Sequence, residues 1–552
     1  MEAVKLNYKP KRKTETWGVL EHGCVEISAR SIYKLNPIAS FIWQQCNGDI
    51  SIGDISYSLA QKCNALSSLE EIQKDVLEIL ETWKYDSLLI MNFNYIHSAL
   101  EYNNDYVYHI NANVDYPVDI LLLSAPTATP MSYSGTSNHL ETLGLGYLSA
   151  YLRQHDFKVG IIDLWKKQLN PNTIKEFVLK YNPQIIGIST MTDNFENGAK
   201  IARIIKEINN DIKIIFGGAH VTFRDKESLF NHNAIDIIAR GEAEYTLLEL
   251  ANFYIHSKGE LSNIDGITYR SNTDIIRTKN RELICDLDIL PFPDRTKIDK
   301  DIVVGVQTSR GCPGQCIFCC ASGLSGGKYR RRSANNVVNE IEILLNKGVK
   351  TIFFQDDTIT VDLKRLHEII DLIEEKKLKF RWSAESRVDV LEKDPSIIQR
   401  MVDAGCIGLQ FGVESGSQKM LNALKKNIKI EQIYNAVTNA ANAGLSPRCT
   451  FLIGHPFETY ESISETIEFA KKLIDIGAES LISAVCPYPG TDICENPQNY
   501  GVKIKQCSYS NYNVLTPIMD TKYLTVTEIK RFYYIYTLEL HQYYQQHKQG
   551  GA

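Results

Sequence analysis

The sequence predicts a multidomain α/β protein with four parts: a winged-helix-like α+β module, an open doubly wound (Rossmann-like) sheet, a partial (β/α)6 barrel and a helical C-terminal tail. The chain has 552 residues, too many for one hydrophobic core and enough for roughly three or four domains. Apolar runs also alternate with amphipathic segments in two separate series, which begin near residues 117 and 301. Such alternation is typical of parallel β/α folds.

Composition and charge narrow the classes of function. With 44% hydrophobic and 23% charged residues, the chain has the composition of an ordinary globular protein. The net charge of −6 disfavours a nucleic-acid partner, which requires a basic surface. No stretch approaches the ~20 apolar residues of a membrane span, so we expect a cytoplasmic protein without membrane contact. The 13 cysteines are mostly scattered singly, which indicates reduced thiols and not a disulfide framework.

Residues 1–98 form the first predicted domain. Short β-like pieces come first, and helical patterns follow in which Ile72, Val76, Ile79 and Leu80 share one face. The predicted segments are strands at 18–27 and 30–35 and helices at 36–48, 54–63 and 69–83. Residues 99–116 are polar and rich in tyrosine, with no sustained period, which indicates a linker.

Residues 117–280 form the second predicted domain. Strongly apolar strands alternate with amphipathic helices, a pattern typical of a parallel sheet covered on both faces. The predicted strands are 118–126, 158–164, 184–190, 213–218 and 236–241, with helices at 143–155, 173–181 and 199–208. A ligand of such a doubly wound sheet lies at the carboxyl ends of its strands.

Residues 281–300 contain LPFPDR and form a proline-marked joint before the third predicted domain, residues 301–495. Its strands are predicted at 303–309, 351–357, 380–386, 407–413, 447–454 and 480–487. Six β/α units are fewer than the eight of a closed barrel, which favours a partial barrel. Residues 496–552 are first irregular and then helical, and we assign their aromatic stripe to packing.

Cys312, Cys316 and Cys319 stand on one loop, GCPGQCIFCC, directly after a predicted strand. Three thiolates can hold three irons of a four-iron cluster and leave the fourth iron open. Zinc is the alternative metal, but it usually takes a fourth Cys or His ligand. The candidates for that ligand are His220 and His455, which are distant in the sequence. Cys320 is not expected to be a ligand, because neighbouring side chains point apart.

This cysteine spacing, with the aromatic Phe318 before the last cysteine, resembles the radical S-adenosylmethionine (SAM) superfamily. The resemblance implies a [4Fe–4S] cluster whose open iron binds SAM, and cleavage of SAM to a 5′-deoxyadenosyl radical. Further matching segments are FFQDD with Asp356 and Asp357, SAESRVD with Glu385 and Arg387, FGVESGSQ with Glu414 and Ser415, and GHPFET with Gly454 and Pro456.

By this resemblance, Arg387 and Glu414 contact SAM, and Asp356 and Ser415 belong to the same cofactor site. Alone, each carboxylate would be read as a solvated strand end, whereas their order behind the cysteine loop favours the cofactor site. The basic run of Lys328, Arg330, Arg331 and Arg332 would usually be a solvated face. Next to an anionic cofactor, one member of that run is expected to neutralise a carboxylate or phosphate.

The second domain resembles the cobalamin-binding domain that precedes the radical SAM core in one large subfamily. Matching segments are SAP, LGLGYLSAYLRQHDFKVGIIDL, GISTMTDN, FGGAH and RGEAE, and they supply Ser189, Gly217, Gly218 and Glu242 as candidate cobalamin-binding residues. A dinucleotide site would instead require GxGxxG after the first strand. The DxHxxG motif is absent, since the loop reads TMTDNFENGA, so we expect cobalt without a histidine from that loop.

The first domain resembles PqqD-like peptide-recognition domains. The matching residues are Leu35–Asn36–Pro37, Ile42–Trp43, Gly48 and Asp75–Val76. Such domains add a leader peptide to a sheet edge, and we expect the strands near Val25 and Tyr33 to form that edge. A winged helix that serves as a structural brace is the alternative.

Together these resemblances imply a maturase that methylates an unactivated carbon of a ribosomally made peptide: the deoxyadenosyl radical abstracts hydrogen, and methylcobalamin delivers the methyl group. The expected partners are a precursor peptide and an electron donor such as flavodoxin or ferredoxin. Radical cyclisation or rearrangement without methyl transfer is the nearest alternative, and a non-catalytic iron–sulfur redox sensor or peptide carrier is a further one. A tRNA-modifying role is disfavoured, since Cys24, Cys46 and Cys63 are too widely spaced for a second cluster motif. No catalytic residue is assigned from the sequence.

Overall fold

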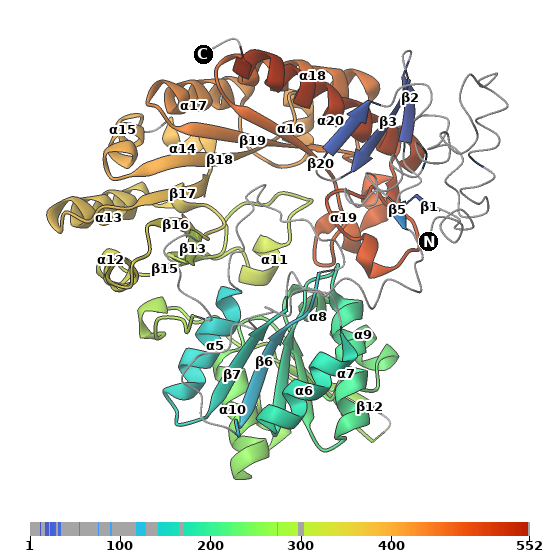
Figure 1. Cartoon of the computed structure of the whole chain (residues 1–552), viewed down its shortest axis with the longest axis vertical. Coiled ribbons are helices and arrows are strands. Elements are labelled where there is room, and N and C mark those ends of the chain that lie inside the picture. Colours follow the sequence, from blue (N-terminus) through green and yellow to red (C-terminus); the bar gives the residue numbers. More distant parts are fainter. Residues whose placement is uncertain are drawn as a thin grey trace. The chain divides into compact units, whose positions relative to one another are not determined.

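The computed structural model describes residues 117–127, 142–164, 170–272, 274–295, 303–392 and 394–549, together with short segments and single positions before residue 91. Two compact units make up the chain (Figure 1). One joins Met1–Val107 with Lys530–Gln542, and the other holds Tyr108–Ile529 and Tyr543–Ala552. Within the described ranges, no helix has both the length and the apolar character that a membrane crossing requires.

The described part of the first unit contains an antiparallel sheet with strand order β2-β3-β4. Its strands are β2 (Trp17–Leu20), β3 (Gly23–Ser28) and β4 (Ser31–Lys34), and β1 (Lys11–Arg12) pairs separately with β5 (Leu89–Ile90). The expectation that the strand of Val25 forms an edge is wrong, because β3 is paired on both sides. The strand of Tyr33, β4, is an edge of this sheet among the described residues.

Other predictions for the first domain are tested at only two positions. Ile55 and Val76 are helical, as predicted, and both are completely buried, which for Val76 agrees with the apolar face that the periodicity predicts. The motif residues Leu35–Asn36–Pro37, Ile42–Trp43, Gly48 and Asp75 lie outside the described residues, as does the predicted linker 99–116.

The second unit begins with a sheet of seven described strands in the order β12-β11-β10-β9-β8-β6-β7, which we call the seven-stranded domain. The strands are β6 (Ile120–Ser124), β7 (Val159–Asp163), β8 (Ile185–Ser189), β9 (Lys213–Gly217), β10 (Ile237–Ala239), β11 (Ile267–Ser271) and β12 (Asp274–Arg277). The first five are parallel, as predicted. The antiparallel pair β11 and β12 was not predicted.

Helices cover both faces of this sheet, because successive residues of each apolar strand point to opposite sides. Leu121, Ile186 and Phe216 pack with helices α6 and α7, whereas Leu122 and Ile185 pack with α5 and α10. Figure 1 shows these two helix pairs on either side of the strands. The helices are α5 (Leu143–Arg153), α6 (Pro171–Tyr181), α7 (Phe195–Ile208), α8 (Ala219–Phe223), α9 (Asp225–Asn231) and α10 (Glu244–His256).

Helix α6 shows how local sequence sets a boundary. Asn170 caps its first turn by accepting a hydrogen bond from the Asn172 amide at 3.0 Å, and Pro171 occupies the first helical position. Asn182 ends the helix in the left-handed conformation, with φ of 42°. The helix therefore starts two residues before the predicted 173–181.

A second parallel sheet has six described strands in the order β13-β16-β17-β18-β19-β20, and we call it the six-stranded domain. The strands are β13 (Val303–Val306), β16 (Thr351–Phe354), β17 (Arg381–Ser386), β18 (Cys406–Glu414), β19 (Ser446–Ile453) and β20 (Glu479–Ala484). Each strand pairs with the one before it, as in a partial barrel, and this confirms the predicted six β/α units.

Helices between the strands cover the six-stranded domain. The main ones are α12 (Ala334–Asn346), α13 (Leu363–Glu375), α15 (Ser396–Asp403), α17 (Ile430–Asn442) and α18 (Tyr460–Asp475). Ser333 caps α12 by accepting from the Asn336 amide, and Asp362 caps α13 by accepting from the Arg365 amide, each at 3.1 Å.

The region after β20 ends in the predicted helical tail, but additional short elements come before it. It contains α19 (Asp492–Glu495) and the antiparallel pair of β21 (Lys503–Ile504) and β22 (Met519–Asp520) before the long helix α20 (Val526–Gln549). Val485, Ile493 and Met519 share one apolar cluster with Ile317 of the cysteine loop. This region therefore supports that loop from behind.

Candidate active site

The cysteine loop follows β13 and the short β14 (Ser309–Arg310). The Gly314 amide donates to the Sγ of Cys312 at 3.4 Å. A Cβ atom placed on Gly314 would lie 3.3 Å from that sulfur and 3.9 Å from the Sγ of Cys316. The two thiols thus lie on one side of Gly314, whose lack of a side chain leaves space between them, and thiolate donors around such a space fit an iron–sulfur cluster.

Burial controls the ionisation of these thiols. It raises the pKa of Cys316, and loss of solvent to the surrounding loop also raises the pKa of Cys319, although that residue keeps an exposed surface. Both groups are therefore protonated at neutral pH until a metal displaces the proton, since only the thiolate is a metal ligand. Burial also raises the pKa of Cys320, which lies beside Cys319 in the wall of the cavity described below.

The two histidines considered as a fourth zinc ligand are both buried beside aromatic rings. In the described ranges, no three His, Cys, Asp or Glu side chains are placed to share a single metal ion. His220 is buried between aromatic rings, with centroids 4.3 Å from Phe195 and 4.4 Å from Tyr509. The ring of His455 is 5.8 Å from that of Phe318, and it is also buried.

Lys426 contacts both Arg387 and Glu414 beside the cysteine loop, and the sequence analysis did not identify it. The Lys426 ammonium is 2.7 Å from the Glu414 carboxylate, and the Lys426 carbonyl accepts from Arg387 at 3.3 Å. The neighbouring Lys425 carbonyl is 3.9 Å from the Sγ of Cys316. Lys426 stands outside every strand-end motif, so only its proximity in the fold reveals it.

Backbone and side-chain contacts constrain this corner further. Glu414 has φ of 69°, in the left-handed region that few non-glycine residues adopt. Ser415 is completely buried, and its hydroxyl is 3.0 Å from that of Thr466 and accepts from the Ser417 amide. Ser415 therefore connects the end of β18 to α18 by hydrogen bonding.

Asp356 and Asp357 have different environments. Asp356 is buried and accepts hydrogen bonds from both the amides and the hydroxyls of Thr308 and Ser309, so its oxygens hold β13 and β14 together. Asp357 accepts from the Gly311 amide at 3.1 Å and lines the large cavity. Although the residue keeps an exposed surface, partial desolvation and the nearby charge of Asp356 raise its pKa. The structure therefore moves the candidate ligand-facing carboxylate from Asp356 to Asp357.

Glu385 is a second carboxyl group in this region with altered acidity. Burial raises its pKa to about 7, and the charges of Asp357 and Glu414 act in the same direction. The Gln410 amide nitrogen donates to it at 3.1 Å. A carboxyl group with this pKa can hold or release a proton near neutral pH.

A cavity of about 720 Å³ connects the strand ends of the two sheets. The wall from the seven-stranded domain includes Ser189, Gly217, Gly218 and Glu242, and the wall from the six-stranded domain includes Gly311, Cys319, Gln355 and Asp357. All four candidate cobalamin residues thus line one cavity with a candidate cluster ligand. Apolar side chains, among them Leu122, Leu145, Ile188 and Leu247, form much of the rest.

The glycines of this cavity fit a large planar cofactor such as cobalamin. A Cβ atom on Gly241 would meet nothing within 4 Å, and the same is true of Gly144. Gly218 has φ of 106°, and a Cβ there would lie 2.2 Å from the Thr190 carbonyl oxygen. The loop that replaces DxHxxG places Met191 at the cavity, whereas Asp193 accepts from Thr127 at 2.8 Å.

The basic run is divided: Arg330 and Arg332 are buried, whereas Lys328 and Arg331 are exposed, and the three arginines pair with protein carboxylates. Arg330 binds Glu242 at 2.8 Å, Arg332 binds Glu340 at 2.5 Å, and Arg331 binds Asp362. These carboxylates belong to the protein, so the expectation that one member neutralises a carboxylate or phosphate of a cofactor stays a prediction. The pairing also engages Glu242, so its carboxylate is held at the cavity wall.

Comparison with known proteins identifies the three modules. Family models match residues 306–470 (radical SAM superfamily), residues 136–251 (B12 binding domain) and residues 23–89 (coenzyme PQQ synthesis protein D, PqqD). An uncharacterized methyltransferase of Pyrococcus horikoshii, PH0819, is 35% identical over 423 residues, covering 75% of this chain and 90% of that protein. An anaerobic magnesium-protoporphyrin IX monomethyl ester cyclase of Rubrivivax gelatinosus is 27% identical, covering 68% and 69%.

Solved structures share the fold at low identity. The radical SAM methyltransferase TsrM from Kitasatospora setae superposes with a TM-score of 0.59 at 17% identity, covering 70% of this chain and 78% of that one. The cobalamin-dependent SAM radical enzyme OxsB gives a TM-score of 0.57 at 20% identity, covering 70% and 56%.

The cofactors follow from these modules. A radical SAM domain takes a [4Fe–4S] cluster and S-adenosylmethionine, and a B12 binding domain takes cobalamin. The space that Gly314 leaves between the thiols and the glycine-lined cavity fit these groups. The chain is therefore an enzyme of the radical SAM superfamily, with a B12 binding domain ahead of its radical SAM domain and a PqqD domain ahead of both.

Proposed function

We propose that this enzyme methylates an unactivated carbon of a ribosomally made peptide. The cavity carries the proposal, because one space is lined both by Cys319 of the cysteine loop and by the glycines of the B12 binding domain. Methyl-transferring relatives support it: PH0819 is named a methyltransferase, and a cytidylyl-2-hydroxyethylphosphonate methyltransferase of Streptomyces wedmorensis is 24% identical over 410 residues. When bound, the cluster with SAM supplies a carbon-centred radical, and cobalamin supplies a methyl group.

The geometry supports a proposed role for each candidate residue. Cys312, Cys316 and Cys319 hold the cluster, and Gly314 leaves the space that their sulfurs require. Arg387 and Glu414 orient SAM, with Lys426 holding both in place. Ser189, Gly217 and Gly218 let cobalamin approach the strand ends closely. Asp357 and Glu385 are the candidate carboxyl groups that face substrate or hold a proton.

The proposed domains are the peptide-recognition module 1–98, the cobalamin-binding domain 117–280, the radical SAM core 301–495 and the C-terminal region 496–552, joined by linkers 99–116 and 281–300. The PqqD match supports a precursor peptide as substrate, with its leader added to the edge strand β4. A flavodoxin or ferredoxin is the proposed electron donor, and the cytoplasm is the proposed location.

The test is mass analysis of anaerobic reactions that contain the reconstituted enzyme, cobalamin, a reductant, methyl-deuterated SAM and peptides encoded beside the gene. A deuterated methyl gain together with 5′-deoxyadenosine is expected. Removing the leader from the peptide is expected to raise KM and leave kcat largely unchanged, since the leader binds away from the reacting carbon. Methylation at equal KM with and without the leader would contradict the peptide-recognition role.

Cys312→Ala tests the cluster assignment. This variant is expected to lose cluster iron and all 5′-deoxyadenosine formation. Cys285→Ser is the matched control, because the Cys285 side chain is exposed and stands outside the cysteine loop. Equal iron content in the two variants would contradict the assignment.

Radical cyclisation is the second candidate function, because cyclases are among the relatives and one aligns over 68% of this chain. 5′-Deoxyadenosine formed together with a peptide lighter by two hydrogens, and without methyl gain, would select it. A non-catalytic redox sensor would form no 5′-deoxyadenosine and has no need of Arg387 and Glu414.

A further inference from the structure

Two arginines of the six-stranded domain bind two glutamates of the seven-stranded domain at the cavity wall. Arg310 bridges both carboxylates: its two terminal nitrogens lie 3.2 Å from Glu242 and 2.7 Å from Glu244. Arg330 binds the other oxygen of Glu242 at 2.8 Å. We call these four residues the interdomain clamp.

The clamp is buried and balanced in charge. Its side chains are 14% (Arg310), 8% (Arg330), 15% (Glu242) and 5% (Glu244) exposed, with two positive and two negative groups. Burial alone would lower the pKa of Arg310, but the two carboxylates raise it above its usual value. Although burial opposes it, the hydrogen bond from Arg330 and the charge of Arg310 lower the pKa of Glu242. Fully ionised buried pairs of this kind hold a fixed geometry, because removing one partner leaves an uncompensated charge.

The clamp connects the two cofactor-binding walls directly. Arg310 stands two residues before Cys312, and Glu242 and Glu244 lie where β10 leads into α10. All four residues line the cavity. A movement of the B12 binding domain relative to the cysteine loop therefore cannot occur without stretching these ion pairs.

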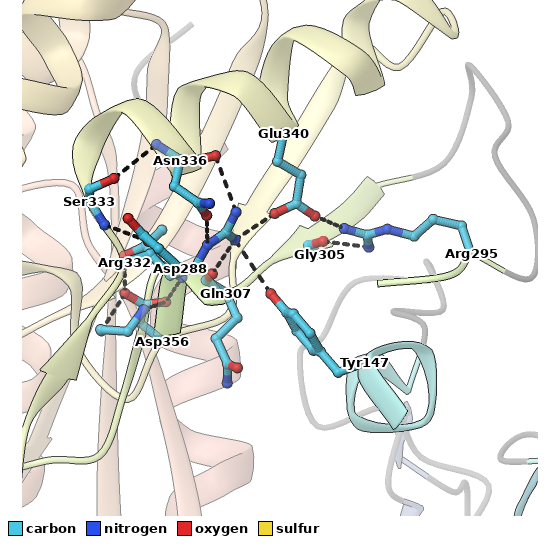
Figure 2. A network of polar contacts seen from close by, with 12 residues as sticks. Tyr147, Asp288, Arg295, Gly305, Gln307, Arg332, Ser333, Asn336, Glu340 and Asp356 are labelled. Carbon is cyan, nitrogen blue, oxygen red and sulfur yellow. Dashed lines mark hydrogen bonds and ion pairs between the residues drawn. The ribbon is translucent and has the colours of Figure 1, made fainter. Parts of the chain in front are cut away.

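A second group of residues contacts the clamp on the side of α5 and α12, and Figure 2 shows part of this group. Tyr147 of α5 lies under the guanidinium of Arg310, 5.2 Å from its ring centre, and its hydroxyl is 3.4 Å from Arg332. Arg332 and Arg295 both bind the buried Glu340 at 2.5 Å. Tyr147 is therefore fixed between a clamp arginine and the helix α12, and it also lines the cavity.

We propose that the interdomain clamp is a positioning device that sets the separation and orientation of cobalamin and the iron–sulfur cluster. Its residues act through the placement of the two walls and need no contact with the reacting atoms. The predicted catalytic consequence rests on the proposed methyl transfer: a radical formed too far from the methyl donor is quenched, so SAM is consumed without product. Misplacement by about 1 Å is enough to cost roughly a hundredfold in rate.

Glu244→Gln tests the proposal, because it removes one charge of the clamp. Glu244 belongs to the seven-stranded domain and is far from the cysteines in the sequence. Glu249→Gln is the matched control: Glu249 is on the same helix, α10, but pairs with Arg281 and is 44% exposed. The first readout is the ratio of 5′-deoxyadenosine to methylated peptide, which should rise roughly tenfold in Glu244→Gln and stay unchanged in Glu249→Gln.

The second readout is independent of activity. The cob(II)alamin electron paramagnetic resonance signal relaxes faster when a reduced cluster is nearby, and this effect falls steeply with distance. Glu244→Gln should slow that relaxation measurably if the walls separate. Iron and cobalamin contents are measured in parallel, so that simple loss of a cofactor is recognised.

Arg310→Lys keeps the charge but cannot reach both carboxylates as a planar fork does, and it serves as a second variant that is expected to fold. Arg310→Lys should change the product ratio and the relaxation rate in the same direction as Glu244→Gln, but by a smaller amount. Wild-type relaxation and wild-type product ratio in both variants, with cofactors retained, would overturn the clamp. If the wild type forms 5′-deoxyadenosine but no methylated product, the proposed function fails, whereas the relaxation measurement still decides the clamp.

Discussion

Glu340 is the centre of a deeply buried ion network (Figure 2), and Glu340→Gln is the perturbation from which most can be learned. The Glu340 side chain is 3% exposed and binds Arg295 and Arg332, which are 6% and 4% exposed. The carboxylate contributes to raising the pKa of Arg332 above its usual value, against the opposing effect of burial. Glutamine has the same size but no charge, so the variant leaves two buried guanidinium groups without their common partner.

The expected magnitude follows from this burial. Breaking a buried ion pair by removing one partner costs about 3–5 kcal/mol. For a domain of this size each kcal/mol lowers the melting temperature by roughly 2–4 °C, so the expected decrease is roughly 6–20 °C. Arg332 still donates to the Asn336 side chain and the Gln307 carbonyl, which favours the lower part of that range.

The assay is thermal unfolding of the full chain, followed by circular dichroism, in comparison with Glu342→Gln. Glu342 is on the same helix, α12, but its ion pair with Lys376 is 42% and 34% exposed. Exposed pairs of this kind contribute about 0–1 kcal/mol, so the control should melt within roughly 4 °C of the parent chain.

Equal melting temperatures for Glu340→Gln and Glu342→Gln would refute the reasoning, because burial would then make no difference to the cost. A decrease confined to Glu340→Gln would support it. Iron content before heating separates loss of the cluster from loss of the fold.

Three further predictions concern single positions. Gly490 has φ of 86°, and a Cβ there would lie 2.4 Å from the ring of Phe223, so Gly490→Ala should destabilise the chain by at least about 1–2 kcal/mol, with partial rescue by Phe223→Leu in urea unfolding. Burial raises the pKa of Glu458 to about 8. The folded state therefore keeps a proton that the unfolded chain releases near pH 4.5, so stability should fall as pH rises from 4.5 to 8, and Glu458→Gln should flatten the pH dependence of the urea midpoint. Gly314→Ala should lower the iron content after reconstitution, because its Cβ would lie 3.3 Å from the Sγ of Cys312, and iron equal to the parent chain would contradict this role of Gly314.

Periodicity and spacing were enough to predict most of the architecture. The five parallel strands of one sheet and the six of the other lie close to the predicted ranges, because each apolar run of about five residues is bounded by a capping or turn residue. The antiparallel strands β11 and β12 were missed, since β12 is largely exposed and DIIR carries little apolar periodicity. The edge assignment of Val25 was wrong, because strand order in an antiparallel sheet depends on pairing and not on local pattern.

Some residues of the candidate site were predicted from the sequence, and others were recognised only in the structure. The cysteines and strand-end residues carry short motifs and were named from the sequence, and their individual roles stay predictions. Three features were recognised only in the structure. They are the contacts of Lys426, the position of Asp357 rather than Asp356 at the cavity, and the interdomain clamp.

The sequence by itself determined the order of the modules, the positions of the cysteines and the parallel sheets, since local spacing encodes each of them. Only the tertiary structure decided which charged residues face the cavity and which neutralise one another. Arg310 and Glu244 are 66 residues apart in the chain but 2.7 Å apart in space. The free energy of such a pair depends on distance and burial, and both quantities arise only when the two domains pack together.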